Sequence, residues 1–164
     1  MPNSSKPEAV RDPQHDAAAC RRRAMDLLAR REHSRLELER KLTGSKFDST
    51  VIGHVLDGLE SDRLLDESRF IESFVRARVG KGHGPARIAV ELGQRGIDGG
   101  RARSWIEDTE LNWPSLAAGV REKRFGPGRP ESFAERARQV RFLQYRGFDS
   151  EQIDAALELA GKSD

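Results

Sequence analysis

Residues 138–153 read Arg-Gln-Val-Arg-Phe-Leu-Gln-Tyr-Arg-Gly-Phe-Asp-Ser-Glu-Gln-Ile, and this stretch decides how we expect the chain to fold. A helical pattern ends at Gly147, and Asp149 opens the next one. Glycine enters the left-handed region at a helix end without a Cβ penalty. An aspartate before a helix accepts backbone N–H groups of its first turn, and Asp149-Ser-Glu-Gln also reads as a capping box. The stretch therefore predicts two helices joined by a tight junction.

The same junction occurs three times along the chain. The residues Phe47, Ile97 and Phe148 are 50 and then 51 positions apart, each preceded by leucine five residues earlier and followed directly by aspartate. Self-similarity at a period of about 20 to 50 residues is typical of repeat proteins. Gly96 precedes the second of these residues as Gly147 precedes the third, but Lys46 precedes the first. We therefore expect a different or a strained helix exit in the first copy.

Helical periodicity between the junctions predicts an all-α protein. No stretch shows sustained period-two alternation, so we expect no sheet. We predict nine helices in three tandem three-helix, helix-turn-helix-like repeats, elongated and curved. The predicted parts are a disordered tail at 1–15 and three-helix modules at 16–65, 66–112 and 113–164. Modules of this size bury little surface alone, so neighbouring modules should support one another.

Apolar spacing within the helices predicts which side chains are buried. In the first helix, expected at 16–31, the core stripe is Ala24, Leu27 and Leu28, with Cys20 as a small core residue. In the seventh, expected at 115–125, Leu116 and Val120 should point inward. Among the aromatic side chains, we expect exposure only for Trp113, Phe125 and Tyr145.

The net charge of +2 hides blocks of opposite sign. Residues 20–46 contain nine Lys/Arg against four Asp/Glu, and residues 47–75 contain two against seven. Residues 76–101 contain six against two, and residues 113–148 contain eight against three. Such alternation favours a partner that offers both phosphates and protein surface over a uniform polyanion.

The sequence contains no recognisable catalytic constellation. Its single cysteine forms no disulfide within the chain, and the four histidines lack metal-ligand spacing, so we expect no metal, no cofactor and no enzyme activity. The loop Gly80-Lys-Gly-His-Gly-Pro85 lacks the GxxxxGK[ST] pattern of nucleotide hydrolases. With no signal-peptide pattern and no apolar run of membrane-span length, we expect a cytoplasmic protein without membrane contact.

The glycine loop and the basic runs leave two interpretations open. Lys81, Arg87 and the N–H groups of the following helix can contact a phosphate or a carboxylate, or the loop is a plain turn in which His83 is an ordinary loop residue. Likewise, a run of arginines is usually a solvated face. Related runs in three modules favour a continuous positive strip that binds phosphates with little sequence preference.

Several segments in order resemble the RecX family of bacterial recombination regulators. They are residues 31–42, 64–70, 82–88 with 91–92 and 95–97, and 141–148, within a resemblance that spans about 17–160. The resemblance implies a monomeric regulator in recombination, DNA repair and the SOS response. Such a regulator binds the RecA recombinase and its filament, and inhibits ATP hydrolysis and strand exchange. It also implies weak, non-specific contact with single- or double-stranded DNA.

Ten basic side chains are the candidate contacts to recombinase or DNA. They are Arg35, Arg69, Arg76, Arg78, Lys81, Arg87, Arg95, Arg138, Arg141 and Arg146.

Two alternatives stay open at this stage. A helix-turn-helix DNA reader predicts sequence-specific duplex binding through side chains at the start of a recognition helix. A helical-repeat adaptor for proteins alone predicts binding that is insensitive to salt and independent of DNA. Salt titration with random and defined DNA distinguishes both from a filament regulator.

Overall fold

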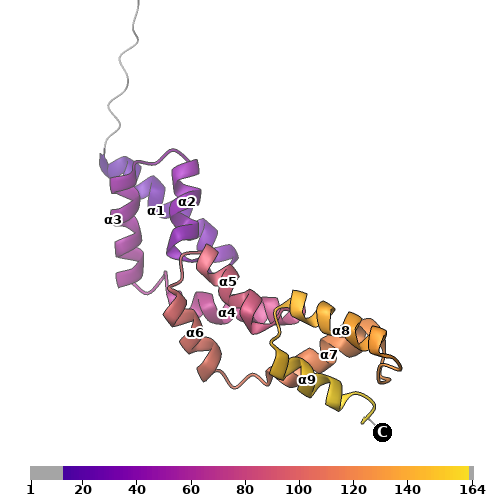
Figure 1. The fold of residues 1–164 in the computed structure, drawn as a ribbon. Coiled ribbons are helices and arrows are strands. Elements are labelled where there is room, and N and C mark those ends of the chain that lie inside the picture. The colour runs from indigo at the N-terminus through magenta and orange to yellow at the C-terminus, as the bar shows by residue number, and fades with distance from the viewer. Residues whose placement is uncertain (1–12, 163–164) are drawn as a thin grey trace, which may run out of the picture. The chain divides into compact units, whose positions relative to one another are not determined.

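The structure is a computed structural model that describes residues 13–162. The predicted tail at 1–15 lies outside the described residues except for 13–15, which belong to the first helix. The helices are α1 (Pro13–Arg30), α2 (Arg35–Gly44), α3 (Ser49–Ser61), α4 (Glu67–Gly80), α5 (Pro85–Gln94), α6 (Gly99–Asp108), α7 (Trp113–Phe125), α8 (Phe133–Arg146) and α9 (Ser150–Leu159) (Figure 1). Within 13–162 there are nine helices and no strand, which confirms the all-α prediction.

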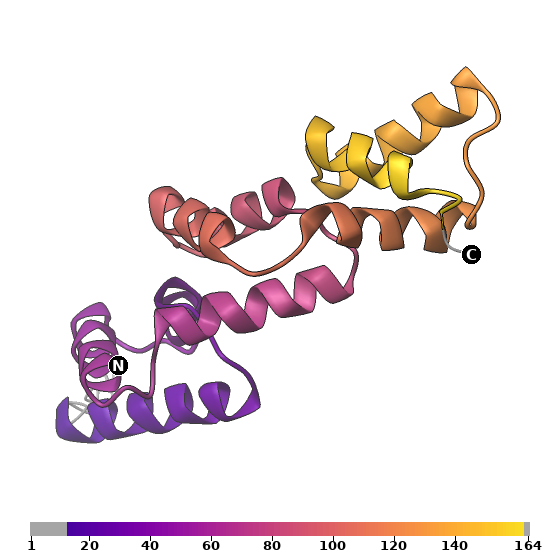
Figure 2. The same ribbon diagram turned by 90° about the horizontal axis from the view of Figure 1, so that it is seen from below.

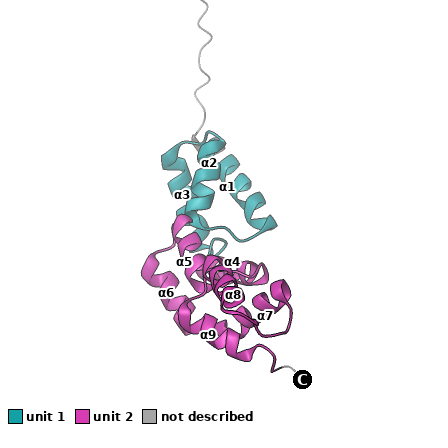
Figure 3. Cartoon of the chain, turned by 45° about the vertical axis from the view of Figure 1, so that its right-hand side comes forward, with its two compact units in different colours: residues 1–67 teal, residues 68–164 magenta. Residues whose placement is uncertain are grey.

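The chain divides into two compact units, which we call unit 1 (residues 1–67) and unit 2 (residues 68–164) (Figure 3). In unit 1, α1, α2 and α3 pack against one another around a single core. Cys20, Ala24 and Leu27 of the predicted stripe are buried there, and Leu28 is partly buried. Helical spacing therefore predicted this face of α1 correctly.

Unit 2 contains the other helices around one shared core. That core joins Phe70 and Ile71 of α4 and Ile88 of α5 to Leu143 of α8 and Ile153 of α9. Helix α9 packs along α7, and α8 closes on both (Figure 2). The hydrophobic core therefore does not divide near residue 112, and the second and third three-helix segments depend on each other for burial.

The three repeated junctions have the same hydrogen-bonded geometry. The N–H groups of Phe47, Ile97 and Phe148 donate to the carbonyl five residues earlier, at 3.3, 3.1 and 3.1 Å. This is the longer bond of the Schellman motif, which ends a helix with one left-handed residue. Gly96 and Gly147 occupy the left-handed position with φ of 82° and 98°. The expected aspartate caps of α3, α6 and α9, including the capping box of α9, are all present.

Lys46 occupies the same left-handed position without being glycine, with φ of 67°. The first junction thus keeps the shared geometry at the cost of strain, because a Cβ crowds the carbonyl oxygen in this region. Replacing Lys46 with glycine is expected to raise the free energy of unfolding of unit 1 by about 1 kcal/mol. Hydrogen exchange of the buried amides in α2 and α3 measures it. Lys46→Ala, which keeps the Cβ, is the control, and an equal gain from alanine would attribute the effect to charge instead.

Helix α7 differs from its prediction. It begins at Trp113, two residues before the expected Ser115, because the Asn112 side chain caps it by accepting the Ser115 N–H at 3.0 Å. Its buried stripe is Trp113, Ala117 and Arg121, four residues apart, so Leu116 and Val120 are only partly buried. The expectation of an exposed Trp113 was wrong, and that of an exposed Tyr145 is confirmed. Phe125 is half-buried, and Phe133, which was not among the expected residues, is exposed at 87%.

The glycine loop between α4 and α5 packs directly on the junction between α8 and α9. The Gly84 N–H donates to the Arg146 carbonyl at 2.7 Å, and the Ala86 N–H donates to the Gly147 carbonyl at 3.0 Å. A methyl group on Gly84 would lie 2.5 Å from the carbonyl carbon of Gly147, so side chains at this contact would force the backbones apart. The glycines therefore allow two helix junctions to touch through their main chains.

Candidate protein and nucleic-acid interface

The basic and acidic blocks of unit 1 largely neutralise each other. Arg35, a candidate contact on α2, pairs with Asp57 at 2.8 Å and Glu60 at 3.1 Å on α3. Arg21 of α1 pairs with Asp62 at 2.9 Å. The guanidinium of Arg35 therefore holds α2 against α3, and the structure gives it a packing role within unit 1.

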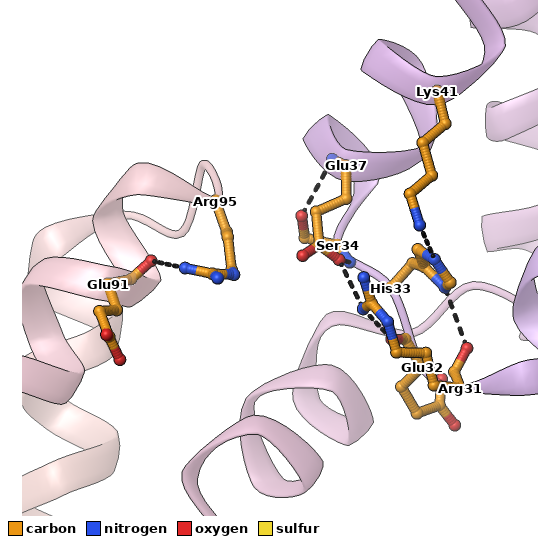
Figure 4. Close-up of polar contacts among 8 residues, drawn as sticks. All are labelled: Arg31, Glu32, His33, Ser34, Glu37, Lys41, Glu91 and Arg95. Carbon is orange, nitrogen blue, oxygen red and sulfur yellow. Dashed lines mark hydrogen bonds and ion pairs between the residues drawn. The ribbon is translucent and has the colours of Figure 1, made fainter. Parts of the chain in front are cut away.

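A buried histidine organises the turn between α1 and α2, and its packing is not apparent from the sequence. His33 Nδ1 lies 3.0 Å from the Arg31 carbonyl, and Lys41 Nζ lies 2.9 Å from His33 Nε2 (Figure 4). A neutral ring with its proton on Nδ1 satisfies both contacts. Burial lowers the pKa of His33, and the Arg31 and Lys41 cations lower it further, although the hydrogen bond to the carbonyl of Arg31 opposes them. The neutral form is therefore the one that this packing favours.

Three candidate arginines of unit 2 converge on Glu91 of α5 and Phe74 of α4. Arg78 Nε lies 2.9 Å from Glu91 Oε2, and Arg87 Nε lies 3.7 Å from Glu91 Oε1. Arg95 donates to the Glu91 main-chain carbonyl at 3.0 Å (Figure 4). The guanidinium groups of Arg78 and Arg95 each lie 4.6 Å from the centre of the Phe74 ring. The fold brings these three arginines together, but much of their charge and surface is used in contacts with Glu91 and Phe74.

The glycine loop does not form an open anion cradle. The Gly84 and Ala86 N–H groups at the start of α5 are already bonded to carbonyls of the α8–α9 junction, which removes these two groups as phosphate donors. His83 is not an exposed loop residue, since only a tenth of its side chain is accessible and Nδ1 lies 3.6 Å from Glu91 Oε2. Burial lowers the pKa of His83, as do the neighbouring arginines, and Glu91 opposes them. Lys81 alone of the loop's polar side chains is exposed.

The outward face of α8 carries two exposed arginines beside an exposed tyrosine, which we call the α8 stripe: Arg138, Arg141 and Tyr145. Spacings of three and four residues place these side chains on one face of the helix. All three are exposed, and Tyr145 is 80% accessible. The Arg87 guanidinium lies 5.7 Å from the Tyr145 ring. Proteins that bind single-stranded nucleic acid combine a solvated aromatic ring, on which a base stacks, with cations that contact the phosphates.

The other candidates lie elsewhere on unit 2. Arg69 and Arg76 are exposed on α4, and Arg76 pairs with Glu72 one turn away at 3.0 Å. Arg146 donates to the Lys81 carbonyl at 2.9 Å, so it also fastens the glycine loop to α8. The ten predicted contact residues thus differ in exposure and in their contacts within the protein. Their contacts to recombinase or DNA stay a prediction.

Arg121 is a buried cation that sequence reasoning missed. It is 2% accessible, its Nε donates to Gln139 Oε1 at 2.8 Å, and Nη1 donates to the Gly126 carbonyl at 3.3 Å. Nη2 donates to the Gly128 carbonyl. Burial lowers the pKa of Arg121, and neighbouring Glu122 opposes that shift. The side chain holds the loop between α7 and α8 in place by supplying donors to it.

Two features that residues 13–162 lack limit the site further. No group of three or more His, Cys, Asp or Glu side chains in this range is arranged to hold a metal ion. Of the helices in the same range, none combines the length and the apolar character needed to cross a membrane. The feature that remains among the described residues is the exposed basic surface of the helical units.

The fold and this surface define a class: an all-α protein built from three-helix repeats. Family models for the first, second and third three-helix domains of RecX match residues 20–59, 66–107 and 115–157. The chain belongs to the RecX family. It is 48% identical over 146 residues to the regulatory protein RecX of Halorhodospira halophila, covering 89% of this chain and 91% of that one. It is 47% identical over 139 residues to the regulatory protein RecX of Pseudomonas entomophila, covering 85% and 90%.

Solved structures agree on the fold. The crystal structure of RecX from Lactobacillus salivarius aligns with a TM-score of 0.75 at 24% identity, covering 89% of this chain and 97% of that chain. A second crystal structure of a regulatory protein RecX aligns with a TM-score of 0.71 at 19% identity. The predicted family and its three-helix repeats are therefore confirmed, and the family is one of regulators.

Proposed function

We propose that this protein regulates homologous recombination by binding the RecA recombinase and its filament on DNA, and that it inhibits ATP hydrolysis and strand exchange. The observation that carries the proposal is membership of a family of regulatory proteins along the length of the chain. The basic surface of unit 2 supports it, because exposed cations without carboxylate partners attract phosphates or acidic protein surface. In this proposal the protein acts as a monomer in the cytoplasm. It is built of three modules, at residues 16–65, 66–112 and 113–164.

The α8 stripe is the DNA-contacting part of this proposal. No ion pair is present for Arg138 or Arg141 among the described residues, and the only partner described for either is the Phe125 ring, 5.5 Å from the Arg138 guanidinium. Both charges are therefore available for phosphate, with Tyr145 beside them for a base. Binding is non-specific in sequence, because phosphate contacts and stacking carry little base information.

A helix-turn-helix reader finds less support in the same geometry. Arg101 in the first turn of α6 donates to Ser68 Oγ at 2.7 Å, and Gln152 in the first turn of α9 accepts the Asp149 N–H at 2.9 Å. Both side chains are thus used in packing or capping. A recognition helix needs such positions free to reach base edges.

Single-stranded-DNA-dependent ATP hydrolysis by the cognate RecA, with this protein titrated in, tests the proposed function. Inhibition supports it. Inhibition well below one molecule per recombinase subunit indicates blocked filament growth or disassembly, and inhibition near one molecule per subunit indicates occupancy along the filament. Unchanged hydrolysis together with no filament binding would leave a helical adaptor for another partner.

The double substitution Arg138→Gln/Arg141→Gln is expected to weaken binding to single-stranded DNA roughly tenfold and to reduce the salt slope by about 1.4, because each phosphate contact on a single strand contributes about 0.7. Fluorescence anisotropy at several salt concentrations measures both values. The matched control is Arg136→Gln on the same helix, since Arg136 pairs with Asp154 at 3.3 Å. An unchanged slope in the double variant would remove the α8 stripe from the interface.

A further inference from the structure

A hollow of about 430 Å³ lies within unit 2, between the glycine loop, α7 and α8. Four cations line it: Lys81 of the loop, Lys123 and Arg124 of α7, and Arg146 of α8. No carboxylate is among the described residues that line it. Arg146 donates to a neutral carbonyl, and no ion pair is present in the described residues for any of the four. The hollow therefore carries uncompensated positive charge and favours an anionic occupant.

The walls of the same hollow are apolar. Val79, Leu116 and Val120 supply aliphatic surface, and Phe142 supplies one ring. Each of these side chains is only partly buried, although each packs against the core of unit 2. A volume of this size lies in the lower part of the roughly 300–1,000 Å³ range of ligand pockets, which are mostly apolar with a few convergent polar groups. An occupant must therefore offer an apolar group as well as negative charge.

A nucleic acid fits these walls poorly. A base would need an open aromatic face for stacking. The Phe142 ring already has the Arg146 guanidinium 5.1 Å from its centre and the Phe125 ring edge-on at 5.3 Å. The aliphatic walls offer a base no hydrogen-bond partner, whereas an aliphatic or aromatic side chain buries favourably against them. The combination of a cationic rim and an apolar floor matches a protein segment.

We propose that this hollow binds a segment of the recombinase in which carboxylates flank one large apolar side chain. The inference rests on the proposed function, since it takes the recombinase as the partner. The apolar side chain enters between Val79, Leu116 and Val120, and the carboxylates meet the cations at the rim. In this proposal the α8 stripe contacts DNA and the hollow contacts the recombinase.

Gly119 provides a way to block the hollow without altering its charges. It lines the hollow from the exposed side of α7, and a Cβ placed on it meets no atom within 4 Å. A Cβ at this helical position therefore meets no clash, and a leucine side chain placed there occupies the space of the hollow. Gly93 of α5 is the matched control, because it is also helical, exposed and open within 4 Å, but it does not line the hollow.

The experiment compares wild type, Gly119→Leu and Gly93→Leu for binding to cognate RecA filaments and to bare single-stranded DNA, with circular dichroism to verify helicity. Gly119→Leu is expected to lose at least tenfold in filament affinity and to keep its DNA affinity, and Gly93→Leu is expected to match wild type in both.

Equal filament affinity in all three proteins overturns the inference while leaving the proposed function intact. A parallel loss of DNA affinity in Gly119→Leu identifies the hollow as a nucleic-acid path and overturns it as well. Absence of filament binding by wild type overturns the proposed function, and the inference with it.

A photo-crosslinking side chain at position 115, an exposed residue that also lines the hollow but is not the position used to block it, identifies the occupant directly on the assembled filament. The expected product is a recombinase peptide with Asp or Glu beside a large apolar residue. A product with DNA, or with a peptide that lacks carboxylates, contradicts the inference.

Discussion

Replacing Gly147 with alanine is expected to lower the free energy of unfolding of unit 2 by about 3–5 kcal/mol, which lies in the high tail for single substitutions. Two causes add. The residue has φ of 98°, where a Cβ costs about 1–2 kcal/mol. The new methyl group would also lie 2.6 Å from the Arg87 nitrogen and press on the Arg87 side chain, so α5 would have to move away. That movement stretches the two main-chain bonds from Gly84 and Ala86.

Two other glycines separate these causes. Gly126 has φ of 86° and ψ of 174°, a conformation that favours glycine, and nothing lies within 4 Å of a Cβ, so Gly126→Ala is expected to cost backbone strain alone, about 1–3 kcal/mol. Gly84 has an ordinary φ of −90°, so Gly84→Ala tests the close approach alone. Urea unfolding of the full chain followed by circular dichroism measures all three. No measurable cost for Gly84→Ala would show that the contact between the junctions adds nothing.

Replacing Arg121 with alanine is expected to destabilise unit 2 by about 3 kcal/mol. The substitution leaves a cavity and removes the donors for Gln139 Oε1 and for the Gly126 and Gly128 carbonyls. The Gln139 bond is buried, and an acceptor left there without its donor costs about 1 kcal/mol or more, whereas water can replace part of the bonds lost by the two part-buried carbonyls. Offsetting this, the cation no longer has to be buried, which is why the expected loss is smaller than the sum of the contacts.

Arg121→Met is the matched variant, because it keeps most of the side-chain volume and removes only the donors and the charge. We expect it to lose about half as much stability as Arg121→Ala, and both variants to accelerate hydrogen exchange in the loop at 126–132. Slow exchange in that loop in both variants would show that Arg121 does not hold it. The loop and α7 are then fixed by the apolar core alone.

Local chemistry in the sequence was sufficient to predict the helices and their junctions. A left-handed glycine, a capping aspartate and an apolar residue between them act within about ten residues. Gly147 and Asp149 therefore predict the end of one helix and the start of the next without information from elsewhere in the chain. Core positions in α1 followed from helical spacing in the same way. Helix α7 was mispredicted because Leu116 and Val120 have the apolar character of core residues, whereas the position that is buried belongs to Arg121.

The candidate site depends on contacts that no local pattern indicates. The sequence identified Arg78, Arg87 and Arg95 as a basic patch, but their shared neighbour Glu91 and the ring of Phe74 determine how much of that charge is free. Arg121 could not be distinguished from an exposed arginine, since its acceptors come from a following loop and from α8. The hollow likewise joins side chains from α4, α7 and α8, and two of its cations, Lys123 and Arg124, were not among the predicted contacts.

The main-chain contact between the two glycine junctions has a consequence for synthesis on the ribosome. The bond from the Gly84 N–H to the Arg146 carbonyl joins residues 62 positions apart. The core of unit 1 lies within residues 17–65 and can close while the rest of the chain is being translated. The start of α5 receives its carbonyl partners only after Gly147 has left the exit tunnel. Until then the apolar surfaces of α4 and α5 that pack on α8 and α9 remain in water, so this interval of translation favours aggregation of the nascent chain.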